Sequence, residues 1–261
     1  MKIIKLGSTG QDVEKWQLFL RGRKKNSCVV VSGCFDQVTH DETKEFQSKL
    51  KLTDDGVVGP ATLSAALKAG FNLMTSDDVD ENSPNWPVKP ALGPLPLLDR
   101  QKLFGKFSYV AAPVASNPEA IKITDDWAKN NIVLVNVPQL AGVKGAPTNN
   151  TIQMHKSIQR QTIDLFSAWE ESCLTSKILS WGGSWVPRFI RGSRTTLSNH
   201  AWGTAFDINV QWNMLGTVPA LRDKEGSVRE LVEIAYEHGF YWGGWFPNRS
   251  DGMHFEAYKI L

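Results

Sequence analysis

The residues best suited to chemistry lie in the last quarter of this 261-residue chain. His200 and Asp207 belong to the segment Ser-Asn-His-Ala-Trp-Gly-Thr-Ala-Phe-Asp, and His254 follows Asp251 in Asp-Gly-Met-His. Two imidazoles and one carboxylate can bind a divalent metal and leave a coordination position open, as in a hydrolytic zinc centre rather than a closed structural site. Asp251 could then activate a water molecule. The sequence therefore predicts a hydrolase that uses Zn²⁺.

The spacing of the first two ligands requires a bend in the chain. His200 and Asp207 are seven positions apart, so in one regular strand they would point to opposite faces of a sheet. Gly203 has no Cβ and permits a bend or bulge between them. We therefore expect His200 on a loop and Asp207 inside a strand over residues 204–210.

The third ligand has an acidic neighbour at strand spacing. His254 and Glu256 are two positions apart, so they share one face of a second short strand. Glu256 is therefore an alternative to Asp251 as the general base.

The pattern Ser-x-His-x-x-Gly-x-Ala-x-Asp followed by Asp-x-x-His resembles the zinc D-Ala-D-Ala carboxypeptidases and L-Ala-D-Glu endopeptidases, which cut peptidoglycan stem peptides. Both halves occur in the family's order, and the Gly-Gly-Trp run at 243–245 is similar to that family as well. The resemblance implies that His200, Asp207 and His254 bind zinc and that Asp251 is the general base. It does not decide between L-Ala-D-Glu endopeptidase and D,D- or L,D-carboxypeptidase activity.

The same resemblance implies a catalytic arginine that stabilises an oxyanion or binds a substrate carboxylate. Arg188 lies in the corresponding stretch, Trp-Val-Pro-Arg-Phe-Ile-Arg-Gly. This local sequence departs from the family's commoner Ser-Gly-Tyr-Arg-Ser motif. Arg191 and Arg194 remain candidates for the same role.

A second resemblance lies near the start of the chain. Segments beginning at Gly33 and Gly56 form a degenerate internal repeat, in which a glycine and apolar residues precede a helix start, and Pro60 suits the first turn of a third helix. The pattern resembles the small three-helix peptidoglycan-binding domain found in many cell-wall hydrolases. It predicts peptidoglycan as the partner of this module.

The predicted organisation is a binding domain at 1–72, a polar and proline-rich linker at 73–97 and a zinc metallopeptidase domain at 98–261. The last is expected to be an α+β domain with an antiparallel sheet. Its predicted elements are a helix at 118–130 capped by Asn117, a buried strand at 132–137, a helix at 151–174, and strands at 177–181 and around Arg188.

Charge and apolar patterning limit the cellular context. A net charge of +2 does not indicate a nucleic-acid partner, and no run is long and apolar enough to insert into a membrane or to act as a secretory signal. We therefore expect a monomer that is made in the cytoplasm and acts on the wall, as a phage endolysin or a secreted antibacterial effector. A holin, or a secretion system with an immunity protein, would be its partner.

The sequence is also compatible with two other classes of protein and with one disulfide bond. A non-haem iron oxygenase also uses two histidines and a carboxylate, but usually with one residue between the first two ligands. A non-catalytic wall-binding protein could retain a structural metal site. Cys28 and Cys34 are close enough in sequence for a small disulfide loop, whereas Cys173 has no obvious partner.

Overall fold

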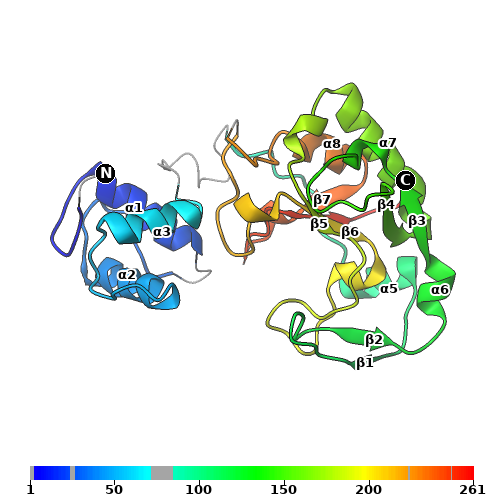
Figure 1. Ribbon diagram of the computed structural model, residues 1–261, viewed down its shortest axis with the longest axis horizontal. Coiled ribbons are helices and arrows are strands. Elements are labelled where there is room, and N and C mark those ends of the chain that lie inside the picture. Colours follow the sequence, from blue (N-terminus) through cyan, green and yellow to red (C-terminus); the bar gives the residue numbers. More distant parts are fainter. Residues whose placement is uncertain (1–2, 24–26, 72–84, 223, 248) are drawn as a thin grey trace. The chain divides into compact units, whose positions relative to one another are not determined.

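The computed structural model describes residues 3–23, 27–71, 85–222, 224–247 and 249–261. It contains two compact units (Figure 1). The first comprises residues 1–89 together with 211–227 and 244–252, and the second comprises 90–210, 228–243 and 253–261. The predicted linker falls partly at 73–84, outside the described residues, and the predicted domain boundaries remain predictions.

The first unit has the three helices that the sequence predicts. Asp36 caps the second helix through Thr39 N–H, and Pro60 opens the third, where its missing N–H costs no hydrogen bond. Four aromatic rings, Trp16, Phe19, Phe46 and Phe71, form the core with centroids 5.2–5.7 Å apart. The helices are α1 (Gln11–Arg23), α2 (Gln37–Lys49) and α3 (Pro60–Lys68).

A buried glutamine supports each of the two repeated glycine turns. Gly33 and Gly56 both have a positive φ, of 69° and 71°. The Gln17 side chain accepts from Gly33 N–H at 3.0 Å, and the Gln47 side chain accepts from Gly56 N–H at 2.8 Å. Each amide group also donates to a threonine hydroxyl on the following helix, at 3.0 Å in both cases. The internal repeat is thus a repeated structural device.

The second unit is built around a four-stranded antiparallel sheet with the order β5-β6-β8-β7. Helices lie on both sides of this sheet (Figure 1). The strands are β5 (Trp181–Gly183), β6 (Ala205–Ile208), β7 (Phe240–Trp242) and β8 (His254–Ala257). The helices are α5 (Leu97–Phe104), α6 (Trp127–Asn131), α7 (Gln159–Glu171) and α8 (Val232–Glu237).

The register of β6 and β8 divides the sheet into an aromatic face and a polar face. Phe206 pairs with Phe255, and their rings stack with centroids 5.4 Å apart. Trp169 of α7 packs against both rings. Asp207 pairs with His254 one position along, so these two side chains point to the opposite face.

Two smaller antiparallel pairs and several short 3₁₀ turns complete this unit. The pairs are β1 (Tyr109–Ala111) with β2 (Ile121–Ile123), and β3 (Ile132–Asn136) with β4 (Thr151–His155). The 3₁₀ turns are η1 (Pro138–Leu140), η2 (Lys156–Ile158), η3 (Thr175–Lys177), η4 (Asn199–Trp202), η5 (Val210–Trp212) and η6 (Gly243–Trp245). The α+β fold class with an antiparallel sheet is confirmed.

The helix predicted at 118–130 is wrong. Asn117 does not cap a helix; it exchanges backbone hydrogen bonds with Val114 in a tight hairpin. The following residues form β2, which pairs with β1, and helical structure begins only at Trp127. A strand partner outside the segment therefore overrides the local helix signals.

The long helix predicted at 151–174 begins too early. Residues 151–155 form β4 against β3, and α7 begins at Gln159. β3 itself is not fully buried, since Leu134 is 63% exposed. The strand predicted at 177–181 begins later than expected, because residues 175–177 form η3 and β5 starts at Trp181. The Arg188 segment, also predicted as a strand, forms isolated bridges.

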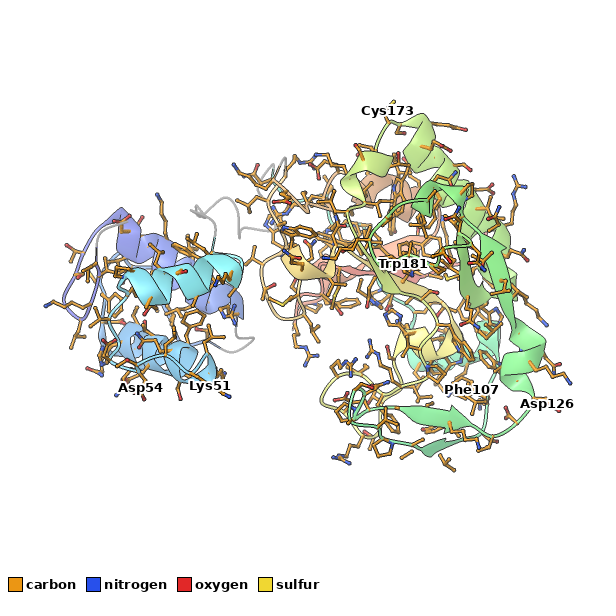
Figure 2. All side chains as sticks on the ribbon, in the orientation of Figure 1. Lys51, Asp54, Phe107, Asp126, Cys173 and Trp181 are labelled. Atoms are coloured by element: carbon orange, nitrogen blue, oxygen red, sulfur yellow. The ribbon has the colours of Figure 1, made fainter. Side chains whose placement is uncertain are left out.

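The tryptophans near the two motifs are buried or partly buried. Trp202, Trp242 and Trp245 are buried core residues. Figure 2 shows Trp181 within the second unit and Cys173 at its edge.

All three cysteines of the chain are free and exposed. Among the described residues, no helix is long and apolar enough to cross a membrane.

Candidate metal centre

His200 lies on a 3₁₀ turn that ends at a left-handed glycine. The turn is η4, and Gly203 follows it with φ 65° and ψ 29°, a conformation that glycine adopts without steric cost. The chain thus reverses before β6 begins at Ala205. His200 Nδ1 lies 2.6 Å from the carbonyl oxygen of Ser184, and because that oxygen can only accept, Nδ1 donates and Nε2 keeps its lone pair. The predicted bend at Gly203 is confirmed.

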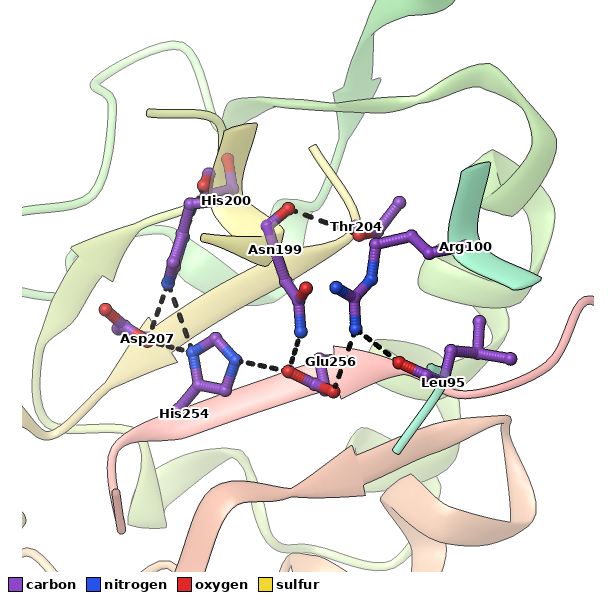
Figure 3. Close-up of polar contacts among 9 residues, drawn as sticks. Leu95, Arg100, Asn199, His200, Thr204, Asp207, His254 and Glu256 are labelled. Carbon is purple, nitrogen blue, oxygen red and sulfur yellow. Dashed lines mark hydrogen bonds and ion pairs between the residues drawn. The ribbon is translucent and has the colours of Figure 1, made fainter. Parts of the chain in front are cut away.

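Three ligand atoms converge on one point on the polar face of the sheet (Figure 3). His200 Nε2 lies 3.2 Å from Asp207 Oδ1 and 3.1 Å from His254 Nδ1. His254 Nδ1 lies 3.0 Å from Asp207 Oδ1. All three side chains are buried.

These spacings fit a metal of zinc's size. Ligands about 2.0–2.1 Å from a tetrahedral zinc ion lie roughly 3.3 Å from one another. Within the part of the chain that the structure describes, no fourth histidine, cysteine or carboxylate joins the three. Two nitrogens and one oxygen with an open position are the donor set of a catalytic zinc site, so the predicted cofactor is confirmed at the level of its ligands.

Glu256 supports His254 from the far side of the imidazole ring. Its Oε2 lies 3.0 Å from His254 Nε2, whereas the ligand atom is Nδ1. Carboxylates in this position fix the tautomer and orientation of a metal-binding histidine. Because Glu256 engages the nitrogen that faces away from the metal position, the geometry disfavours Glu256 as the general base.

Two further residues hold the Glu256 carboxylate, and sequence reasoning identified neither. The side-chain amide of Asn199, next to His200, donates to Glu256 Oε2. Arg100 of α5 approaches the other oxygen, with Nη2 3.7 Å from Oε1. The Asn199 contact could have been sought from its place beside a ligand. No local signal points to Arg100, because 156 positions separate it from Glu256.

The Asp207 carboxyl is stabilised in its charged form. Burial alone would raise the pKa of Asp207, but its electrostatic and hydrogen-bond interactions with the His200 and His254 imidazoles hold that pKa well below its usual range. A carboxylate that stays ionised in a buried site is suited to hold a cation.

The three candidate arginines differ in their surroundings. Arg188 carries the carbonyl oxygen to which Ser198 N–H donates at 3.0 Å, and its own Nη1 donates to the Phe189 carbonyl oxygen at 3.1 Å. Arg191 forms an ion pair with Glu119 at 2.6 Å, while Arg194 is exposed. The structure therefore commits Arg191 to the 117–119 turn.

Asp251 is not part of the three-residue cluster. It is half-buried and lies in the 244–252 segment, which belongs to the first compact unit, whereas the three ligands belong to the second. Its role as the base, like that of Arg188, remains a prediction.

Comparison with known families agrees with this ligand set. Residues 191–257, which include all three ligands, match the D-alanyl-D-alanine carboxypeptidase family. This matched segment is therefore similar to that family and contains three residues that could hold a metal ion. Residues 9–66, which include α1, α2 and most of α3, match a putative peptidoglycan binding domain. Both predicted resemblances are confirmed.

One similar solved structure is that of a fused Zn-dependent amidase/peptidase/peptidoglycan-binding domain-containing protein from Clostridium acetobutylicum. It is 27% identical, the match covers 39% of this chain and 40% of that chain, and the TM-score is 0.24. This chain therefore matches less than half of that protein's length, and the TM-score is too low to relate the two folds. No curated protein matches this chain in sequence.

Proposed function

We propose that this protein hydrolyses an amide bond in the stem peptides of peptidoglycan. The observation that carries the proposal is the convergence of His200, Asp207 and His254, with ligand atoms 3.0–3.2 Å apart, inside a carboxypeptidase-family domain. The putative peptidoglycan binding domain at 9–66 supports this polymer as the substrate.

Zinc supplies Lewis acidity when it is bound: it acidifies water and polarises the scissile carbonyl. The chain's own residues do the rest. Ser184 and Glu256 hold the two imidazoles in the tautomers that present Nε2 of His200 and Nδ1 of His254. Asp251 accepts a proton from the attacking water and delivers it to the leaving amine as the carbon–nitrogen bond breaks.

Arg188 is the proposed partner of the oxyanion that develops in this reaction. A guanidinium beside the developing negative charge stabilises the transition state more than the ground state, and so raises the chemical rate. The Glu119 ion pair of Arg191 favours Arg188 over Arg191 in this role.

Which bond is cut follows from the products. We propose either L-Ala-D-Glu endopeptidase or D,D- or L,D-carboxypeptidase activity, and mass spectrometry of purified muropeptides distinguishes these possibilities. A carboxypeptidase releases only the terminal D-alanine, whereas the endopeptidase releases the stem from its second residue onward. If neither product forms with zinc-loaded protein, the chain is better described as a wall-binding protein with a structural metal site.

We further propose a monomer that acts as a phage endolysin or as a secreted antibacterial effector. Expression in bacteria separates this role from an inert one: the protein should lyse cells when a signal peptide directs it to the periplasm. The same chain kept in the cytoplasm should be harmless until a holin or a secretion system provides passage. Protection by the product of an adjacent gene would favour the effector, and an adjacent holin gene the endolysin.

A further inference from the structure

We infer that Arg100 is a positioning residue for the metal centre. Arg100 acts through Glu256, which in turn orients the zinc ligand His254. This inference rests on the zinc site of the proposed function. It assigns a role to a residue that lies outside both metal motifs, on a helix 100 positions before His200.

The contacts form a continuous chain from α5 to the ligand atom (Figure 3). Arg100 Nη2 lies 3.7 Å from Glu256 Oε1, and Glu256 Oε2 lies 3.0 Å from His254 Nε2. On the other edge of the same imidazole, Nδ1 faces Asp207 and His200. A movement of the carboxylate would therefore rotate the ring that carries the ligand atom.

The arginine is itself held in place on two sides. Its Nη2 donates to the Leu95 carbonyl oxygen at 2.7 Å, just before α5 begins. Its guanidinium carbon lies 5.7 Å from the centre of the Trp202 ring, on the same 3₁₀ turn as His200. Arg100 thus contacts the environments of two metal ligands, His200 through Trp202 and His254 through Glu256.

Because Glu256 is buried, its carboxylate needs the positive charge of Arg100 nearby. Arg100 is 8% exposed and Glu256 is 2% exposed. A buried carboxylate without an opposite charge is strongly unfavourable, so removal of the guanidinium would force Glu256 to reorient towards water or to change its partners. Either response withdraws the acceptor from His254 Nε2.

A purely structural role is the competing explanation, since Arg100 also ties the start of α5 to the sheet. The two explanations differ in whether the effects of the Arg100 and Glu256 substitutions on zinc affinity are coupled. If Arg100 acts through Glu256, its loss has no further effect on zinc affinity once Glu256 has been altered. If Arg100 only anchors α5, the two losses add.

The test is a double-mutant cycle on zinc affinity, measured with zinc alone by chelator competition on the full chain. Glu256→Gln should weaken zinc binding about tenfold or more, as expected for the partner of a metal-binding histidine. Arg100→Gln should weaken it to a similar extent, and the double variant should equal Glu256→Gln alone. Thermal unfolding of each zinc-free variant, followed in parallel, confirms that the protein being titrated is folded.

Two further variants complete the design. Arg160→Gln removes the same group from an exposed ion pair with Asp164 on α7, and should leave zinc affinity unchanged. If Arg100→Gln does not fold, Arg100→Lys replaces it. The expected loss is about threefold, because a lysine keeps the positive charge but lacks the planar guanidinium whose Nη2 faces both Leu95 and Glu256.

Unchanged zinc affinity in either Arg100 variant, or additive losses in the double variant, would overturn the inference. Failure of the unaltered protein to bind zinc would count against the proposed function instead. Because no substrate enters the measurement, an error about the bond that is cut leaves this test intact.

Discussion

Gly182 lies directly against the metal ligand Asp207. A Cβ at position 182 would lie 2.5 Å from Val210 Cγ2, 2.9 Å from the Cβ of Asp207 and 3.2 Å from the Asp207 carbonyl oxygen. The contact arises where β5 meets β6 with an irregular register, Gly183 being opposite Asp207. Only a residue without a side chain fits here.

Gly182→Ala is therefore expected to displace Val210 and, with it, the β6 backbone at Asp207. The added methyl group overpacks a buried site, which typically costs about 1–3 kcal/mol of unfolding free energy, and it moves a zinc ligand. Zinc affinity by chelator competition and stability by denaturant unfolding should both fall. Gly93→Ala is the matched control, because a Cβ there has no neighbour within 4 Å. Equal behaviour of the two variants would contradict the contact.

Asp251→Ala separates proton transfer from metal binding. We expect zinc to remain bound, because Asp251 is not one of the clustered ligands, and turnover of muropeptides to fall at least about a hundredfold through loss of a general base. His200→Ala should instead lose zinc and activity together. An Asp251→Ala protein with full activity would remove this residue from the mechanism.

Removal of the metal should abolish hydrolysis without releasing the protein from the wall. The putative peptidoglycan binding domain, at 9–66, contains none of the three ligands. After treatment with a chelator, sedimentation with purified peptidoglycan should persist while muropeptide products disappear, and added zinc should restore them. Loss of sedimentation on chelation would show that the two functions depend on each other.

His155 should make the protein less stable in mild acid. Burial lowers the pKa of His155 from 6.5 to about 4. Between these values the unfolded chain binds a proton that the folded protein does not, so stability falls as the pH falls through this window. The expected loss between pH 7 and pH 5 is about 2 kcal/mol.

Guanidinium unfolding at the two pH values measures this loss, and His155→Phe is the variant that should remove most of it. A phenyl ring retains the edge contact with Phe104, whose centroid lies 5.0 Å from that of His155, but cannot bind a proton. The lowered pKa of Asp207 acts in a separate range, since stability from an acid with a lowered pKa is lost only near and below its ordinary value of 3.8. An unchanged pH dependence in His155→Phe would assign the effect to other groups.

Gln17 and Gln47 should be essential to the two glycine turns of the first unit. Gln47→Ala leaves the buried Gly56 N–H without its acceptor, at an expected cost of roughly 1–3 kcal/mol. Gln37→Ala removes a glutamine of the same helix that bonds only the exposed Asp41 among its side-chain contacts, and should change stability by less than about 0.5 kcal/mol. Thermal unfolding and sedimentation with peptidoglycan compare the two variants.

The zinc ligands could be predicted from sequence because their geometry is largely local. Gly203 marks the reversal between His200 and Asp207, and two-residue spacing puts His254 and Glu256 on one face of β8. The helix starts of the first unit are equally local, since Asp36 and Pro60 act within one turn.

The failures come from partners distant in sequence. Asn117 and the proline after it have the composition of a helix start, yet residues 121–123 pair with β1. Residues 151–155 likewise leave their expected helix to pair with β3. Arg100 meets Glu256 only because α5 lies beside the polar face of the sheet, a relationship that no short pattern encodes.

The pairing of Phe206 with Phe255 has a consequence for how this protein can change over evolution. The stacked rings on one face and the Asp207–His254 pair on the other depend on the same alignment of two strands. A shift of one residue in the pairing register of β6 and β8 would turn the phenylalanine rings towards the metal position and the metal ligands into the hydrophobic core. Selection for the metal-binding residues would therefore also act on Phe206 and Phe255, which lie on the opposite face of the sheet.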